Sequence, residues 1–150
     1  IGIALDGKKH AIVDTIIPGT RCYLYSYSAY DTAIPRTRFR QALEHYAARA
    51  PDSRSFGAAN VYVGEYGIPE NDFPADKVRA VIRDNTETAL DFGCPWVVYW
   101  QLYDNEARRQ PVKTNADCRG FWLVRPDGST SWAWDYFASL LRGGGGGGSR

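Results

Sequence analysis

The sequence has no methionine and only three cysteines, Cys22, Cys94 and Cys118, among its 150 residues. These cysteines are odd in number and lack the paired short spacing of a structural zinc site or a disulfide framework. The only two histidines, His10 and His45, are too isolated to propose a metal site. We therefore expect mostly buried free thiols, no metal and no cofactor.

Strong charge of either sign is also missing, because 18 Lys and Arg are balanced by 17 Asp and Glu. The basic residues form no stripe, which gives no reason to expect a nucleic acid or an anionic membrane as partner. No run approaches the roughly 18 consecutive apolar residues of a membrane span, and the N-terminus lacks a basic-then-apolar signal pattern. We expect neither a nucleic-acid nor a membrane partner.

Aromatic residues, in contrast, are abundant, with five Trp, ten Tyr and six Phe. Such rings suit a packed core and also suit the flat apolar faces of sugars. A glycine run at 143–148, followed by Ser149 and Arg150, cannot pack a core. We therefore divide the chain into a folded domain at 1–142 and a flexible tail at 143–150.

Strand-like and helix-like segments alternate along the folded domain. The short aromatic or apolar runs predict strands, and the runs with helical spacing, ended by Pro51 and Gly93, predict helices. Alternation of this kind indicates an α/β fold with parallel strands and right-handed crossovers, either a doubly wound sheet or a piece of a barrel. The expected strands lie at 22–30, 60–66 and 95–103, with a short extended piece at 120–124, and the expected helices lie at 37–49, 74–92 and 132–141.

Glu65 stands near the end of the expected strand at 60–66 and is soon followed by Gly67. Because alternate residues of a strand share a face, we expect Glu65 to point to the same side as Val61 and Val63. A carboxylate at the C-terminal end of a parallel strand occupies the usual catalytic rim of a barrel. The spacing alone also fits an ordinary rim residue paired with an arginine.

Three motifs in order resemble the last strands of the retaining (β/α)8-barrel glycoside hydrolase clan that includes cellulases, mannanases and many β-glycosidases. The closing stretch also resembles that clan's last hairpin and helix, where a glycine-led strand and an Asp-Gly turn precede an aromatic helix. The sixth-strand, seventh-strand and eighth-strand motifs and the closing stretch are matched by SYSAYD (26–31), VYVGEYG (61–67), WVVYWQLYDNE (96–106) and GFWLVRPDGSTSWAWDYF (120–137).

This resemblance implies roles for individual residues. Glu65 matches the catalytic nucleophile. Tyr30 matches a tyrosine that faces the active site and can donate a hydrogen bond to that nucleophile. Ser28 matches a second active-site position, although many clan members carry a histidine there. Trp100 matches the platform under the sugar, and Trp96, which shares its face by the period of two, would fill the barrel below it. Glu106, Asp31, Glu70 and Asp104 lie in predicted rim loops and could line a sugar site.

The chain is too short for a complete barrel of this kind, which needs about 250 residues. The resemblance therefore implies half of a (β/α)8 barrel, from about the fifth strand to the last helix, without the fourth-strand glutamate that serves as acid/base. Such a half exposes two sheet edges and the inner face of its strands. We expect a homodimer or a complementary half-barrel chain, with a carbohydrate as substrate.

The sequence leaves three functions open. The first is a glycoside hydrolase, or a fragment of one, that cleaves β-linked glycans by retaining double displacement with Glu65 as nucleophile. The second is a catalytically incomplete half-barrel that binds carbohydrate or serves as an assembly unit through Trp100 and Tyr30. The third is an unrelated α/β hydrolase or transferase, which the lack of a Gly-x-Ser-x-Gly elbow, a phosphate-binding loop and a dinucleotide fingerprint disfavours.

Overall fold

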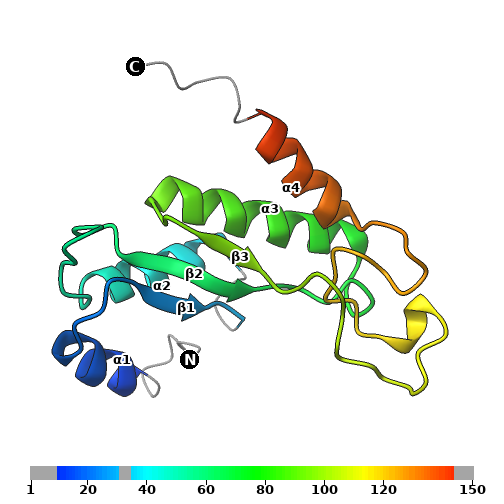
Figure 1. The fold of residues 1–150 in the computed structure, drawn as a ribbon, viewed down its shortest axis with the longest axis horizontal. Helices are drawn as coiled ribbons and strands as arrows, with labels where there is room; N and C mark the ends of the chain where they lie inside the picture. Colours follow the sequence, from blue (N-terminus) through cyan, green and yellow to red (C-terminus); the bar gives the residue numbers. More distant parts are fainter. Residues whose placement is uncertain (1–9, 31–34, 144–150) are drawn as a thin grey trace. The chain divides into compact units, whose positions relative to one another are not determined.

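The computed structural model describes residues 10–30 and 35–143, and the structural statements below concern those residues. They form a mixed α/β chain with one three-stranded parallel sheet (Figure 1). The helices are α1 (His10–Ile16), α2 (Arg36–Ala47), α3 (Ala75–Phe92) and α4 (Trp132–Gly143), with short 3-10 helices η1 (Ile17–Gly19) and η2 (Asn115–Asp117), and the strands are β1 (Tyr25–Ser28), β2 (Val61–Tyr66) and β3 (Val97–Tyr99).

The chain divides into two compact units. The first consists of Ile1–Gly67 and Asp84–Tyr99 and contains the whole sheet, whereas the second consists of Ile68–Arg83 and Trp100–Arg150. Helix α3 begins in the second unit and ends in the first. The two units are described separately below.

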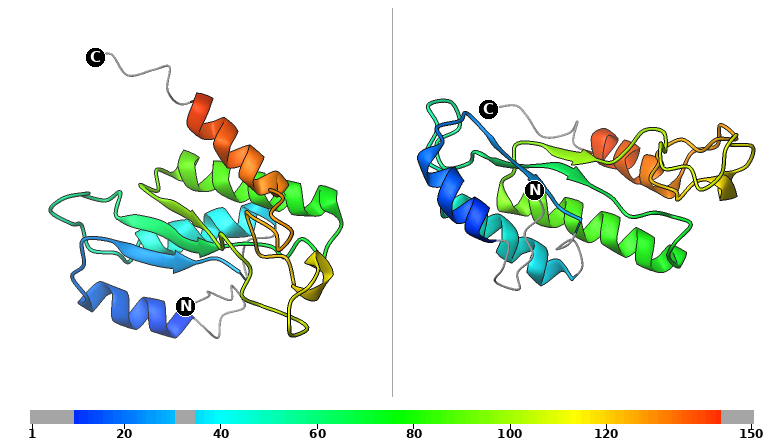
Figure 2. Two further views of the ribbon diagram at one scale, coloured as in Figure 1. Left: turned by 45° about the vertical axis from the view of Figure 1, so that its right-hand side comes forward. Right: turned by 90° about the horizontal axis from the view of Figure 1, so that it is seen from below.

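The core of the first unit lies between the sheet and helices α2 and α3, which cover the same face of the sheet (Figure 2). Tyr27 of β1 is fully buried and packs against Phe39 and Tyr46 of α2, with ring centroids 6.1 and 5.1 Å apart. Aromatic pairs of this geometry contribute about 0.5–1.5 kcal/mol beyond the area they bury. On β2, Tyr66 is buried and its hydroxyl is hydrogen-bonded to Thr86 of α3.

The second unit is built mainly from loops around Trp122, which is only 1% exposed. A turn at Asp127 and Gly128 joins the bridged residues Val124 and Thr130, and Gly128 takes a φ of +84°. A positive φ of this size is readily adopted only by glycine. The turn leads into α4, so the expected Asp-Gly turn and final helix are confirmed. Of the extended piece expected at 120–124, only Val124 forms a β-bridge.

Most expected elements are present with shifted ends, but one expectation about burial is wrong. Strand β3 covers only three of the predicted residues, and Val98 within it and Trp96 directly before it are 47% and 48% exposed. The almost continuously apolar run at 95–103 predicted a strand that is buried on both faces. In the first unit α2 and α3 cover one face of the sheet (Figure 2), and the exposure of Trp96 and Val98 shows that the other face meets solvent there. Helix α1 was not predicted.

Candidate active site

Strand β1 separates its side chains cleanly between the two faces of the sheet. Tyr25, Tyr27 and Ala29 are buried against the helices, whereas Ser26 is exposed and Ser28 partly exposed on the other side. The sequence predicts this division, because Leu24, Ser26, Ser28 and Tyr30 alternate with three tyrosines and Ala29 in the expected strand at 22–30. We call the second side the open face, and in the first unit it also carries Tyr62, Gly64, Trp96 and Val98.

A β-bulge interrupts the same alternation in β2. Tyr27 pairs with Val63, but the next residue of β1, Ser28, pairs with Glu65, so that Gly64 is an extra residue in the ladder. Paired residues of neighbouring strands share a face, and an extra residue reverses the alternation beyond it. Tyr66, one residue later, is accordingly buried on the helix side.

The bulge places Glu65 on the open face, opposite to the buried Val61 and Val63. The expectation that these three side chains share one side is therefore wrong, because it assumed an unbroken period of two. Without the extra residue Glu65 would point into the helix-covered core. Bulges occur often beside active sites, where they redirect a side chain.

Tyr30 provides the polar partner of Glu65. Its hydroxyl donates to Oε1 of Glu65 at 2.7 Å, and the backbone N–H of Ala29 donates to the carbonyl of Glu65, also at 2.7 Å. The first of these bonds confirms the contact anticipated from the sequence. Because the strands are parallel, these groups gather at the C-terminal edge of the sheet, where Ser28 lies opposite Glu65 in register.

The two other predicted substrate contacts belong to the second unit. Trp100 follows directly after β3 and is partly exposed. Glu106 accepts a hydrogen bond from Nη1 of Arg119 at 2.9 Å, within a charged group that includes Asp72 and Arg108. The structure thus brings Glu65, Tyr30 and Ser28 together in one unit.

The remaining rim carboxylates have structural partners. Glu70 accepts from Arg125 at 2.7 and 3.1 Å and from the indole N–H of Trp122. Burial alone would raise the pKa of Glu70, but these hydrogen bonds and the charges of Arg125 and Arg79 outweigh it and hold that pKa below its usual value. Glu70 is therefore a carboxylate at neutral pH and a poor proton donor.

Asp104 likewise serves the backbone of the second unit. Its carboxylate accepts from the N–H groups of Glu106 at 2.7 Å and of Phe121 at 3.1 Å, and also from that of Gly120. These bonds tie together the two chain segments of the loop region. Asp31, the other rim carboxylate considered from the sequence, lies outside the described residues.

An aromatic group on the open face was not foreseen. The ring of Trp96 meets Phe56 edge-on at 5.4 Å and Tyr62 at 6.3 Å. Sequence parity placed Trp96 in a barrel interior, whereas in this chain about half of it is exposed. Phe56 lies in a loop without periodic spacing, and so no sequence pattern indicated that it joins this group.

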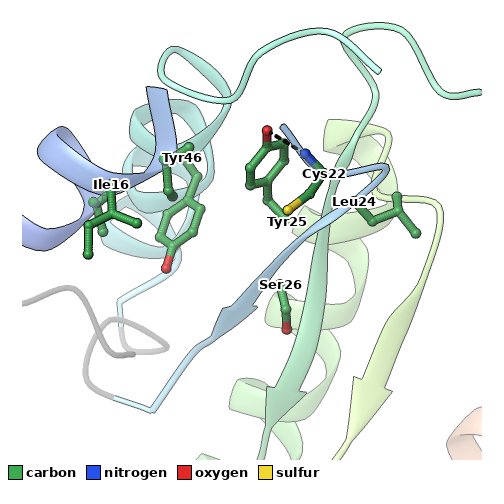
Figure 3. A pocket seen from close by; sticks show the side chains of 8 residues that line it. Ile16, Cys22, Leu24, Tyr25, Ser26 and Tyr46 are labelled. Atoms are coloured by element: carbon green, nitrogen blue, oxygen red, sulfur yellow. Dashed lines mark hydrogen bonds between the residues drawn. The ribbon is translucent and has the colours of Figure 1, made fainter. Parts of the chain in front are cut away.

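A separate apolar cavity of about 260 Å³ lies at the opposite, N-terminal end of β1 (Figure 3). Near it the hydroxyl of Tyr25 accepts from the backbone N–H of Cys22 at 3.2 Å and donates to the carbonyl of Thr20. Ser26, which lines the cavity, pairs with Tyr62 of β2 and not with Glu65. Its lining comes from α1, η1, the following loop, β1 and α2: Val13, Ile16, Ile17, Cys22, Leu24, Tyr25, Ser26 and Tyr46.

All three cysteines are free thiols, two buried and one, Cys22, exposed, so the expectation of mostly buried thiols is confirmed. Within residues 10–30 and 35–143, no group of three His, Cys, Asp or Glu side chains could hold a metal ion. In the same part of the chain, no helix is both long and apolar enough to cross a membrane.

No protein-family model, no curated protein and no solved structure matches the chain. The chemistry of the site must therefore be argued from Glu65 and its surroundings.

Proposed function

We propose that this chain provides the nucleophile of a retaining glycoside hydrolase that acts on β-linked glycans, with Glu65 as the attacking carboxylate. The observation that carries the proposal is the hydrogen bond from Tyr30 to Oε1 of Glu65 at the C-terminal edge of parallel strands. A nucleophile must be held in one direction, and a donated hydrogen bond fixes the orientation of the carboxylate. The bulge supplies the direction.

The chemistry follows from which oxygen is engaged. Tyr30 occupies Oε1, which leaves Oε2 to attack the anomeric carbon of the sugar. A bond forms between Oε2 and that carbon, the bond to the leaving oxygen breaks, and water later hydrolyses the glycosyl ester. A second carboxyl about 5 to 5.5 Å away normally protonates the leaving oxygen. Glu70, with its lowered pKa and three structural donors, is unsuited to that role.

The resemblance implies that the acid/base glutamate comes from outside this chain, and we extend the proposal to assembly on that basis. The open face carries exposed Trp96 and Val98, and β1 and β3 are the edge strands of the sheet. Exposed sheet edges and apolar faces favour pairing with another chain. In this proposal a second copy, or a complementary half-barrel chain, covers the open face and brings the acid/base carboxyl to Glu65.

An activated substrate tests the nucleophile without needing the partner. The leaving group of a dinitrophenyl β-glycoside is a stable phenolate that needs no proton. The first step should therefore proceed with Glu65 alone. We expect release of dinitrophenolate that Glu65→Gln abolishes, and faster turnover when azide is added to attack the glycosyl ester. The matched control is Glu44→Gln on α2, whose carboxylate is exposed and paired with Arg40 and should be dispensable for this step.

A second candidate is carbohydrate binding without turnover, which the Trp96, Tyr62 and Phe56 group favours. Exposed aromatic rings stack on apolar sugar faces, and Ser28 offers a hydroxyl on the same side of the sheet. Oligosaccharide titration monitored by tryptophan fluorescence would show saturable binding that Trp96→Ala removes. Binding that survives in Glu65→Gln, without any release of dinitrophenolate from the unaltered protein, would select this candidate.

A further inference from the structure

The bulge that directs Glu65 rests on a close approach between two strands. The extra residue of β2 is Gly64, and the neighbouring residue on the open face of β1 is Ser26. A Cβ atom added to Gly64 would lie far inside contact distance of Ser26 Oγ, 3.3 Å from Ser26 Cβ and 3.2 Å from Cε2 of Tyr62. The hydroxyl of Ser26 occupies the space where a side chain of residue 64 would stand.

Gly64 is required here for space rather than for backbone conformation. Its φ does not fall in the positive range that Gly57, Gly93, Gly120 and Gly128 adopt. An alanine could therefore take the same backbone angles, but either the Ser26 hydroxyl would have to turn away or the two strands would have to move apart, and Tyr62 and Ser26 Cβ would have to give by a few tenths of an ångström. Two consecutive residues, Gly64 and Glu65, have to share the open face at a bulge, and only one of them can carry a side chain beside Ser26.

The geometry points to Ser26 and Gly64 as a size-matched positioning pair that holds the bulge and thereby directs Glu65 toward Tyr30. Neither residue touches substrate in this account, because both act through the direction of the Glu65 carboxylate. The positioning itself rests on the register, the burial and the contacts given above. Its consequence for turnover rests on the proposed function.

The pair makes a reciprocal prediction. Gly64→Ala should displace β2 against β1 and separate Glu65 from Tyr30. Ser26→Ala removes only the hydroxyl and should leave the bulge unchanged. In the double variant the new methyl group meets Cε2 of Tyr62 at 3.2 Å and Ser26 Cβ at 3.3 Å, distances that a shift of a few tenths of an ångström relieves. The second substitution should therefore rescue the first.

The test is a ¹³C spectrum of protein labelled at the side-chain carboxyl carbon of glutamate. Glu65→Gln assigns the Glu65 signal, and Tyr30→Phe gives the signal position without the Tyr30 hydrogen bond. We expect Gly64→Ala to move the signal to that position, Ser26→Ala to leave it in place, and the double variant to restore it. Gly19→Ala, where an added Cβ meets nothing within 4 Å, is the matched glycine control.

Turnover of the dinitrophenyl glycoside provides a second readout. A misplacement of about 1 Å can cost about a hundredfold in rate, so kcat should fall to that extent in Gly64→Ala with little change in KM, and should recover in the double variant. If the spectra follow the predicted pattern while the unaltered protein releases no dinitrophenolate, the positioning pair stands and the proposed function fails.

Two results would overturn the proposal that Ser26 and Gly64 together position Glu65. One is a Glu65 signal that stays in place in Gly64→Ala. The other is a double variant that remains displaced, or that is as unfolded by circular dichroism as Gly64→Ala alone, because Ser26 would then not be the obstacle.

Discussion

Glu70 gives the sharpest stability prediction, because three hydrogen bonds converge on it. Trp122 is 1% exposed, so its indole N–H would have neither water nor an acceptor in the Glu70→Ala variant. Leaving such a donor unpaired lowers the free energy of unfolding by about 1–3 kcal/mol. The same change removes the ion pair with Arg125, whose side chain is 21% exposed against 28% for Glu70. The contribution of such a partly exposed ion pair to stability lies between that of an exposed pair and that of a buried pair. Together these effects predict a loss of about 3 kcal/mol in the free energy of unfolding.

Two matched variants separate the effects. Glu70→Gln keeps an acceptor oxygen but loses the charge, so we expect it to cost about 1–2 kcal/mol. Glu106→Gln removes a more exposed ion pair, with side chains 42% and 40% exposed, and should cost less than about 1 kcal/mol. Urea unfolding followed by tryptophan fluorescence measures all three, and the Glu70→Ala midpoint should fall by about 1–2 M.

The charge contribution also has a defined pH dependence. The folded-state pKa of Glu70 lies below its ordinary value of 4.5. A lowered folded-state pKa means that the charge stabilises the protein above that ordinary value and that this contribution disappears as the pH falls through the folded-state pKa. The stability difference between the unaltered protein and Glu70→Gln should therefore be largest near pH 7 and shrink below about pH 4.5. Equal costs for Glu70→Ala and Glu106→Gln, or a difference that persists in acid, would refute this reasoning.

Three further predictions concern single sites. Gly120→Ala should destabilise more than Gly93→Ala, because both have positive φ but an added Cβ at Gly120 also meets backbone nitrogens at 2.8 and 2.9 Å; equal unfolding midpoints would contradict this. Cys22 should react with a thiol reagent at pH 8, whereas Cys94, whose pKa burial raises to about 11, should stay unreacted until the protein unfolds. Tyr30→Phe should lower kcat about tenfold, within the range of a charge-assisted hydrogen bond, and should change stability little because Tyr30 is 42% exposed; an unchanged kcat would argue against its role.

Local signals in the sequence were sufficient for α2, α3 and α4 but not for α1. The helical spacing of Phe39, Leu43 and Tyr46 predicted α2, and all three are buried. Gly93, with a φ of +93°, ends α3 as expected from its position. These signals act within one or two turns of the chain, so a single sequence carries them.

The open face and the bulge depended on contacts between strands. A period of two predicted the faces of β1 correctly, but the extra residue in β2 becomes visible only from its register with β1. The sequence does contain Gly64 at that place, yet a glycine in a strand fits several roles. The exposure of Trp96 was missed for a related reason, because an apolar run does not state whether both faces of its strand are covered.

The partners of the loop carboxylates also lay beyond sequence reasoning. Glu70 and Arg125 are 55 positions apart, and Asp104 caps backbone groups 16 and 17 positions away. No periodic pattern links residues at such separations. The hydrogen bond between Tyr30 and Glu65 was anticipated only because the resemblance to the glycoside hydrolase clan placed both at the same end of adjacent strands.

The most direct test of the central claim is to trap the covalent intermediate. The protein is incubated with a 2-deoxy-2-fluoro dinitrophenyl glycoside, whose glycosyl ester hydrolyses slowly, then digested and analysed by mass spectrometry. If Glu65 is the nucleophile, a single sugar adduct forms on the peptide that contains Glu65, and none forms in Glu65→Gln. An adduct on another carboxylate, or dinitrophenolate release that continues unchanged in Glu65→Gln, would contradict it.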